Sequence, residues 1–215
     1  MHKVTFEFEK DILEANRKIA SANSKRLAKY GIRSCDFQGA IGSGKTSIIK
    51  RLAKKLKSKG KSVAAIAGDC FGKDDYREFK KIGLVAININ TGKECHLDAH
   101  LVEQALDELP LKNIDVLFIE NVGNLICPAD FALGTEKRVV VISVTEGKNM
   151  IRKHPVIFGL ADVTVLNKIE LADIMNVNIK NLERDFKKIN PHGNFLCASA
   201  KTGKGITELM RYLGL

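Results

Sequence analysis

The sequence has no long hydrophobic run. No stretch reaches the roughly 18 consecutive apolar residues that a membrane-spanning helix requires. The N-terminal segment MHKVTFEFEKD also carries charges where a secretion signal would have an apolar region. We therefore expect a protein that neither spans a membrane nor is exported, and we assign it to the cytoplasm.

Cysteines in a CxxC spacing are also missing. The chain has five cysteines, an odd number, and no secretion signal that would bring them to an oxidising compartment. A disulfide framework is therefore not expected. The thiols should be reduced, which leaves them available as metal ligands.

The chain has no tryptophan and only three tyrosines, although its net charge is +10. A basic protein can bind nucleic acid by releasing counterions from the phosphates, but binding to single strands also uses aromatic rings for base stacking. Much of the excess charge lies in two segments with helical periodicity, NSKRLAKYGIR and KRLAKKLKSKGK. We interpret both as solvated helix faces rather than as a nucleic-acid footprint, and predict no nucleic-acid partner.

Short apolar runs alternate with amphipathic segments along most of the chain. The apolar runs cover residues 34–38, 62–68, 84–89, 115–121, 138–144, 162–168 and 194–199, and helical patterns begin near residues 44, 74, 96, 178 and 205. Strands that are apolar on both faces and separated by helices form a mostly parallel sheet covered on both sides. We predict one three-layer α/β domain over residues 31–215, preceded by a helical arm over residues 1–30.

The segment GAIGSGKT lies between the first predicted strand and a helix. It satisfies the pattern G-x-x-x-x-G-K-[ST] in the context that this pattern requires, so we predict a P-loop NTPase; the alternative is a glycine turn that binds nothing. Backbone N–H groups of such a loop surround phosphate oxygens, and the helix N-terminus adds positive potential. Lys45 should neutralise the outer phosphates, and the Thr46 hydroxyl should bind Mg²⁺. The predicted nucleotide-binding residues of this segment are Gly39, Ala40, Ile41, Gly42, Ser43, Gly44, Lys45, Thr46 and Ser47.

Acidic residues end two of the predicted strands. Glu120 follows the apolar run VLFI, Asp69 ends VAAIAGD, and Asp75 follows about one helical turn further on. We expect Glu120 and Asp69 to hold Mg²⁺ together with Thr46, and Asp75 to lie near the γ-phosphate or its attacking water. Lys45, Asp75 and Glu120 are the predicted catalytic residues. The alternative, above all for Asp75, is a helix cap or a solvated charge.

Two segments in the second half resemble the base-reading motifs of GTPases. VLNKIE resembles the N-K-x-D motif, and CASAK resembles the S-A-K loop. In the first motif the acid accepts two hydrogen bonds that guanine donates and adenine cannot. Here the acid is Glu170 instead of aspartate, which leaves both strict and relaxed guanine selectivity as interpretations. The predicted base-binding residues are Asn167, Lys168, Glu170, Ser199, Ala200 and Lys201.

The segment TGKECHLDAH brings a cysteine, two histidines and an aspartate close together. With NVGNLICPA, SVTEG and the nucleotide motifs, it resembles the HypB family, the nickel-inserting GTPases of [NiFe]-hydrogenase maturation, from about residue 12 to the C-terminus. The resemblance implies a metal site made by Cys95, His96 and Cys127. Two thiolates and an imidazole suit nickel or zinc and are poor ligands for Mg²⁺. The alternative is that these residues are structural, and His100, which matches no ligand position of the family, is expected at the surface.

The resemblance also implies partners. It predicts a homodimer, promoted by GTP and by metal, that shares the nickel or zinc site, and a HypA-type nickel accessory protein that docks on the arm. The arm could instead pack on its own domain. The hydrogenase large subunit would be reached indirectly. Some members begin with a Cys-x-x-Cys-Gly-Cys motif or a histidine-rich run, and this sequence has neither, so no separate N-terminal nickel store is expected.

The activity predicted from these motifs is hydrolysis of GTP with Mg²⁺ as cofactor. The intrinsic rate is expected to be slow, because no arginine finger is evident near the switch segments. The alternatives are a urease-type nickel accessory GTPase, although that family has a Cys-Pro-His element missing here, and a non-catalytic metal carrier gated by nucleotide. A nucleoside-phosphate kinase is the weakest alternative, since a kinase has no use for the base-reading pair of motifs.

Overall fold

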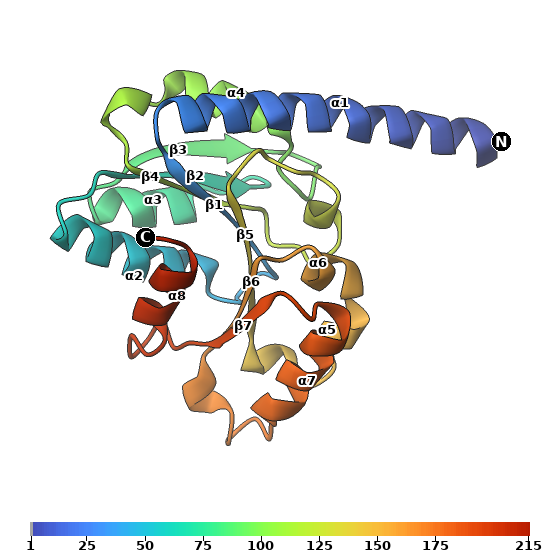
Figure 1. Cartoon of the computed structure of the whole chain (residues 1–215), viewed down its shortest axis with the longest axis vertical. Helices are drawn as coiled ribbons and strands as arrows, with labels where there is room; N and C mark the ends of the chain where they lie inside the picture. Colours follow the sequence, from blue (N-terminus) through green and yellow to red (C-terminus); the bar gives the residue numbers. More distant parts are fainter. Residues whose placement is uncertain (1) are drawn as a thin grey trace.

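The structure, a computed structural model, describes residues 2–215, with side chains from residue 10 onward. Within these residues one sheet of seven strands has the order β3-β2-β4-β1-β5-β6-β7, and every neighbouring pair is parallel (Figure 1). The strands are β1 (Arg33–Gln38), β2 (Val63–Asp69), β3 (Val85–Asn90), β4 (Val116–Glu120), β5 (Lys137–Ser143), β6 (Val163–Asn167) and β7 (Asn194–Cys197). The predicted parallel α/β fold is confirmed.

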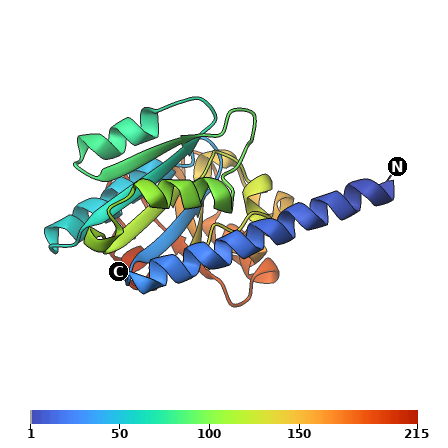
Figure 2. The same cartoon turned by 90° about the horizontal axis from the view of Figure 1, so that it is seen from above.

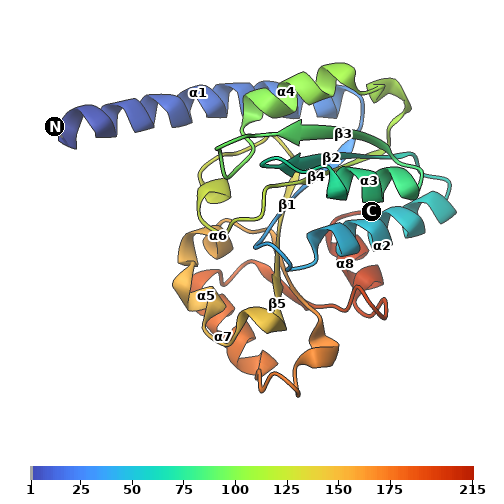
Figure 3. The same cartoon turned by 180° about the vertical axis from the view of Figure 1, so that it is seen from behind.

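Helices cover both faces of this sheet (Figures 1 and 3). They are α1 (His2–Lys29), α2 (Lys45–Ser58), α3 (Asp74–Lys81), α4 (Ala99–Glu108), α5 (Met150–Lys153), α6 (Pro155–Gly159), α7 (Ile179–Ile189) and α8 (Ile206–Tyr212). Four short 3-10 helices, η1 (Leu111–Asn113), η2 (Cys127–Ala129), η3 (Val144–Glu146) and η4 (Ile169–Leu171), lie in the connections. None of the described helices is both long and apolar enough to cross a bilayer.

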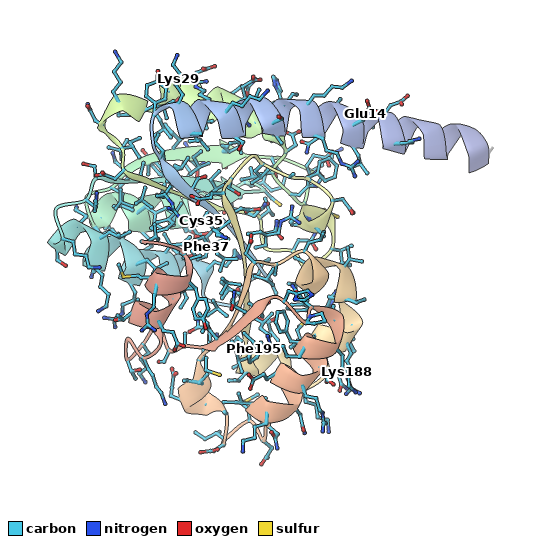
Figure 4. The ribbon with its side chains drawn as sticks, viewed as in Figure 1. Glu14, Lys29, Cys35, Phe37, Lys188 and Phe195 are labelled. Carbon is cyan, nitrogen blue, oxygen red and sulfur yellow. The ribbon has the colours of Figure 1, made fainter. Side chains whose placement is uncertain are left out.

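Successive residues of the strands face opposite layers that are both covered, which is why β2, β4 and β5 consist mainly of apolar residues. Cys35 and Phe37 of β1 pack in the cluster that α2, α3 and α8 form on one face, and they lie in the middle of the molecule (Figure 4). On the other face, α1 and α4 cover β2 and β4, while α5, α6 and α7 cover β5 and β6. A parallel sheet brings the carboxyl ends of all its strands to one edge, so the loops that follow β1, β2, β4, β5 and β6 meet there.

The second half of α1 packs against α4, and its first half extends beyond the domain (Figure 2). Nδ2 of Asn16 donates to the Ala132 carbonyl (2.9 Å), and its Oδ1 accepts from the Ala99 amide (2.8 Å). Nδ2 of Asn23 donates to the Ala99 carbonyl (2.8 Å) and to the Leu133 carbonyl (3.2 Å). The second half of the helix therefore packs on its own domain, as the alternative interpretation of the arm expected. The domain boundary at residue 30 stays a prediction.

The predicted elements differ from the observed ones mainly at their ends. The helix expected from about residue 96 begins at Ala99, because the Asp98 side chain caps it by accepting from the Leu101 amide (2.8 Å). This later start leaves Cys95 and His96 in a loop at the edge of the sheet. The short helices α5 and α6 were not predicted, since neither is long enough to show a helical period.

Candidate functional site

The P-loop connects β1 to α2 and has the backbone that its glycines permit. Gly42 and Gly44 have φ values of 79° and 99°, which favour glycine. A Cβ on Gly44 would come within 2.2 Å of Nδ2 of Asn167, so the loop and the base-reading segment are in close contact. Lys45, only 6% exposed, donates to the Gly39 carbonyl (3.1 Å). The loop thus leads into the N-terminus of α2, where phosphate oxygens can be bound.

Three of the predicted Mg²⁺-binding and catalytic residues meet at the first turn of α2. Oγ1 of Thr46 lies 2.7 Å from Oδ1 of Asp75 and 3.0 Å from Oε1 of Glu120. Oε1 of Glu120 is also 4.0 Å from Nζ of Lys45. Asp69, at the end of β2, lines the same cavity as these residues, but Asp75 and Glu120 are the acids in contact with the Thr46 hydroxyl.

Burial has the largest effect on the pKa of the Glu120 carboxyl. Desolvation raises the pKa of this carboxyl to about 8, although Lys45 and the Thr46 hydroxyl act in the opposite direction. Its second oxygen, Oε2, is buried and has no hydrogen-bond partner. An orphaned carboxylate oxygen beside a hydroxyl is a fitting ligand set for a hydrated Mg²⁺, whose charge would favour the ionised carboxylate.

One cavity of about 670 Å³ joins these groups. Its walls include the P-loop, the three acids, the segment that follows Glu120, and Lys168. Cys95, a predicted ligand of the other metal, also lines it. The predicted nucleotide site and the predicted nickel or zinc site therefore share a wall of this cavity.

The base-reading motifs lie together at the other end of the P-loop. Asn167 connects them, since its Nδ2 donates to the Ser43 carbonyl (2.9 Å) and its Oδ1 accepts from the Ala200 amide (3.0 Å). Lys168 has a left-handed backbone (φ 60°) and donates from Nζ to the Gly42 carbonyl (2.8 Å). Ser199 is buried, and Glu170 is exposed at the start of the next turn. The predicted base-binding segment is therefore exposed to solvent at Glu170.

Glu146, which the motifs did not single out, also faces this region. It closes η3, accepts from the Ser143 amide through Oε1 (2.9 Å), and has a buried Oε2 without a partner. Burial raises the pKa of its carboxyl to about 7, and the nearby charges of Lys45 and Lys168 lower it. The signal available in the sequence was an acid three positions after Ser143, where a strand ends.

Cys95, His96 and Cys127 come together beside this cavity. Their ligand atoms lie within 4.8 Å of one another, and the two Sγ atoms are 3.0 Å apart. The His96 ring stacks on Phe131, with 3.9 Å between ring centroids, and its Nδ1 is buried without a partner. Desolvation lowers the pKa of His96, which favours the neutral imidazole that binds metals. This donor set fits nickel or zinc.

His100 lies outside this cluster. Its exposed ring contacts Glu103 and Gln104 on α4, which agrees with the expected surface position. Asn124 instead supports the cluster, because its Nδ2 donates to the Cys95 carbonyl (3.3 Å). The backbone of Asn124 forms an isolated β-bridge with Gly39, the first residue of the P-loop.

The chain is similar to proteins of one known family. The model of the CobW/HypB/UreG nucleotide-binding domain matches residues 35–197. The sequence is 52% identical over 214 residues to the probable hydrogenase maturation factor HypB of Methanocaldococcus jannaschii, covering 99% of this chain and 96% of that protein.

Solved structures with similar folds include two crystal structures of HypB. The hydrogenase maturation factor HypB from Archaeoglobus fulgidus has a TM-score of 0.86 at 41% identity and covers 94% of this chain and 98% of its own. HypB from Helicobacter pylori in complex with nickel has a TM-score of 0.87 at 32% identity and covers 93% of each chain. The chain belongs to the HypB family of hydrogenase maturation factors, within the SIMIBI class of P-loop GTPases.

Proposed function

We propose that this protein is a GTP-hydrolysing metallochaperone that carries nickel, or zinc, at Cys95, His96 and Cys127 and assists nickel insertion into [NiFe]-hydrogenase. The observation that carries the proposal is the position of Cys95, which lines the nucleotide cavity and lies 3.0 Å from Cys127 through its Sγ. A movement caused by exchange of the nucleotide at the P-loop would therefore need to be transmitted over only a short distance to displace a metal ligand.

In this proposal, the N-terminus of α2 and Lys45 hold the phosphates while water attacks the γ-phosphate to give GDP and phosphate. Thr46 and Glu120, with Asp69 nearby, would bind Mg²⁺, which neutralises charge on the β- and γ-phosphates. Asp75, which contacts the Thr46 hydroxyl, would orient the attacking water. The intrinsic rate should be slow, because none of the described residues lining the cavity is an arginine. Lys45→Ala should abolish hydrolysis, and normal turnover in this variant would overturn the assignment.

The base is proposed to be guanine. Asn167 ties the P-loop to the loop of Ser199, Ala200 and Lys201 through two hydrogen bonds, which supports a shared nucleotide site. The exposed carboxylate of Glu170 is free to accept hydrogen bonds from guanine.

The metal cluster supplies three ligands and leaves the fourth position of a tetrahedral site open. A second copy of the chain, related by a two-fold axis, would bring its own cluster close and complete the coordination. Three apolar side chains near the P-loop and the cluster support such an interface, because Ile41, Phe71 and Ile126 are 87%, 78% and 64% exposed. We propose that GTP and metal together promote this homodimer.

The first half of α1 is proposed to dock the HypA-type nickel accessory protein. Ile12 lies on this half and is 54% exposed, whereas the second half is covered by α4. The hydrogenase large subunit would receive nickel through this machinery, not by direct contact with α1.

The test is a titration of purified protein with Ni²⁺ or Zn²⁺ in the presence of GDP or of a non-hydrolysable GTP analogue. Metal content and particle mass are measured together, and phosphate release is followed separately. We expect tighter metal binding and a dimeric mass with the analogue. Identical affinity and mass in both nucleotide states would overturn the gating, and absence of phosphate release would leave a non-catalytic carrier.

A further inference from the structure

Three buried polar side chains lie at the ends of β1 and β4, between the P-loop and the metal cluster. They are Asp36, Gln38 and Asn121, exposed by 2%, 0% and 1%, and we call them the Asp36 group. Each carboxylate oxygen of Asp36 accepts one hydrogen bond: Oδ1 from Nδ2 of Asn121 (3.2 Å) and Oδ2 from Nε2 of Gln38 (2.6 Å). Asp36 thus joins the last residue of β1 to the residue that follows β4.

Gln38 and Asn121 are each the immediate chain neighbour of a residue of the predicted nucleotide site. Gln38 precedes Gly39, the first residue of the P-loop, and Asn121 follows Glu120. The Asn121 amide also donates to the Phe37 carbonyl (3.0 Å), which holds the ends of β1 and β4 together. Displacement of either segment by the γ-phosphate must therefore move a member of the group.

The same two side chains hold the segments that carry the metal ligands. Oδ1 of Asn121 accepts from the amide of Leu97 (3.0 Å), the residue after His96. Nε2 of Gln38 donates to the carbonyl of Pro128 (3.1 Å), the residue after Cys127. The positions of both ligand segments are thus set by hydrogen bonds to side chains that Asp36 connects.

We propose that the Asp36 group consists of positioning residues through which the bound nucleotide sets the spacing of the metal ligands. The inference rests on the proposed function, and it names the side chains that would carry the coupling. Buried polar groups cannot exchange a protein partner for water without a penalty, so the group shifts as a unit instead of losing its bonds. A shift of Asn121 relative to Gln38 changes the distance between His96 and Cys127.

A second connection bypasses the Asp36 group and provides a comparison. Asn124 pairs with Gly39 through its backbone and holds the Cys95 carbonyl through its side chain. Asn124→Ala removes the second contact and leaves Asp36 untouched. The two routes can therefore be separated by mutation.

The test uses Asp36→Asn, which keeps the shape of the side chain. The new amide has one acceptor oxygen in place of two, so it cannot satisfy both amide donors that face it. Ni²⁺ affinity is measured with GDP and with a non-hydrolysable GTP analogue, both with Mg²⁺, and the ratio of the two affinities is the readout. We expect a ratio above about 5 in the wild-type protein, as is typical of coupled sites. In Asp36→Asn it should fall below about 2 while GDP affinity changes by less than about threefold.

The matched control is Thr164→Val, because Thr164 is fully buried in the same sheet and its hydroxyl has no partner. This variant should keep the wild-type ratio. An unchanged affinity ratio in folded Asp36→Asn would overturn the inference. A ratio that falls in Asn124→Ala but not in Asp36→Asn would assign the coupling to the route through Asn124. A wild-type protein that binds Ni²⁺ equally in both nucleotide states would overturn the inference and the gating, but not hydrolysis or metal binding. A wild-type protein that binds no metal would overturn the proposed metallochaperone itself.

A second measurement does not depend on any variant. The NMR chemical shift of the Leu97 amide reports the geometry of its bond to Asn121 in the wild-type protein. Replacing GDP by the GTP analogue should shift this resonance, because the group moves while it keeps its bonds. An unchanged resonance would overturn the inference even if Asp36→Asn failed to fold.

Discussion

The Sγ atoms of Cys95 and Cys127 lie 3.0 Å apart, although 32 positions separate the two residues in the chain. Cys95 lies in the loop after β3, and Cys127 begins η2 after β4. The hydrogen bond to the Cys127 thiol is the main reason why the pKa of Cys95 is raised. A divalent cation between the two sulfurs would reverse this effect, because it stabilises the thiolates that bind it.

Replacing Cys127 by serine should remove the metal site. We expect Ni²⁺ or Zn²⁺ affinity to fall by at least about 100-fold, since residues that only support ligands already change affinity by about 10- to 100-fold. GDP affinity should not change. The measurement is competition with a chelator of known affinity, and Cys197→Ser, which alters a half-buried thiol outside the cluster, is the control. Wild-type metal affinity in Cys127→Ser would exclude this residue as a ligand.

Replacing Glu170 by alanine should remove most of the preference for GTP over ATP. The lost acceptor forms charged hydrogen bonds worth about 1.5–3 kcal/mol, so GTP affinity should fall by about 10- to 150-fold and ATP affinity should hardly change. Glu170 is exposed, so the substitution should not affect stability. The measurement is equilibrium binding of both nucleotides to both proteins. Equal binding of ATP and GTP by the wild-type protein would refute guanine recognition.

The order of strands and helices could be predicted from the sequence because the physical signals are local. Strands such as β5 and β6 are apolar on both faces, and the glycines of the P-loop mark a turn between strand and helix. The ends of elements depend on contacts with distant residues. The start of α4, for example, is capped by Asp98, and its first amide is held by Asn16 from α1. No periodicity in the segment itself shows the second of these contacts.

The residue types of the site could be predicted, but the hydrogen bonds that connect its two parts could not. The motifs named Glu120, the cysteines and the base-reading residues, because each motif carries its chemistry in a fixed spacing. Asp36 and Gln38 lie in β1 and belong to no motif. Their role depends on Asn121 and Pro128, which come close only when β1 and β4 pair. Glu146 lies in the segment SVTEG and bonds locally to the Ser143 amide, but its proximity to Lys45 and Lys168 depends on the fold and is not shown by that segment.

The two halves of α1 should differ in what they contribute. Asn23→Ala would leave the buried carbonyls of Ala99 and Leu133 without their donor, so the free energy of unfolding should fall by about 1–3 kcal/mol. Deleting residues 2–13 keeps Asn16 and Asn23, and should leave stability and GTP hydrolysis unchanged while weakening binding to a HypA-type partner. Denaturant unfolding, phosphate release and binding to the purified partner are the measurements. Loss of folding in the deletion would assign the first half to the domain core as well.

A deletion through residue 28 tests less, because it also removes Leu27, which packs in the core cluster with α4. Unfolding of that longer deletion would report lost packing and would say nothing of a partner. Asn23→Ala in the full-length chain is therefore the control for stability, since it weakens the second half of α1 and leaves the exposed Ile12 in place.

Asp36 should make the protein less stable as the pH rises. Burial raises the pKa of this carboxyl from its ordinary value of 3.8 to about 6, so the folded chain binds the proton more strongly than the unfolded chain does. The resulting stabilisation is complete below pH 3.8 and is lost as the pH rises through about 6. Between about pH 5 and pH 7, this one group should lower the free energy of unfolding by about 1 kcal/mol. Asp36→Asn cannot titrate, so the difference in stability between wild-type and variant, measured by denaturant unfolding, should change by that amount over this interval. Thr164→Val should follow the wild-type pH dependence, and a constant difference between wild-type and Asp36→Asn would show that Asp36 stays ionised in the folded protein.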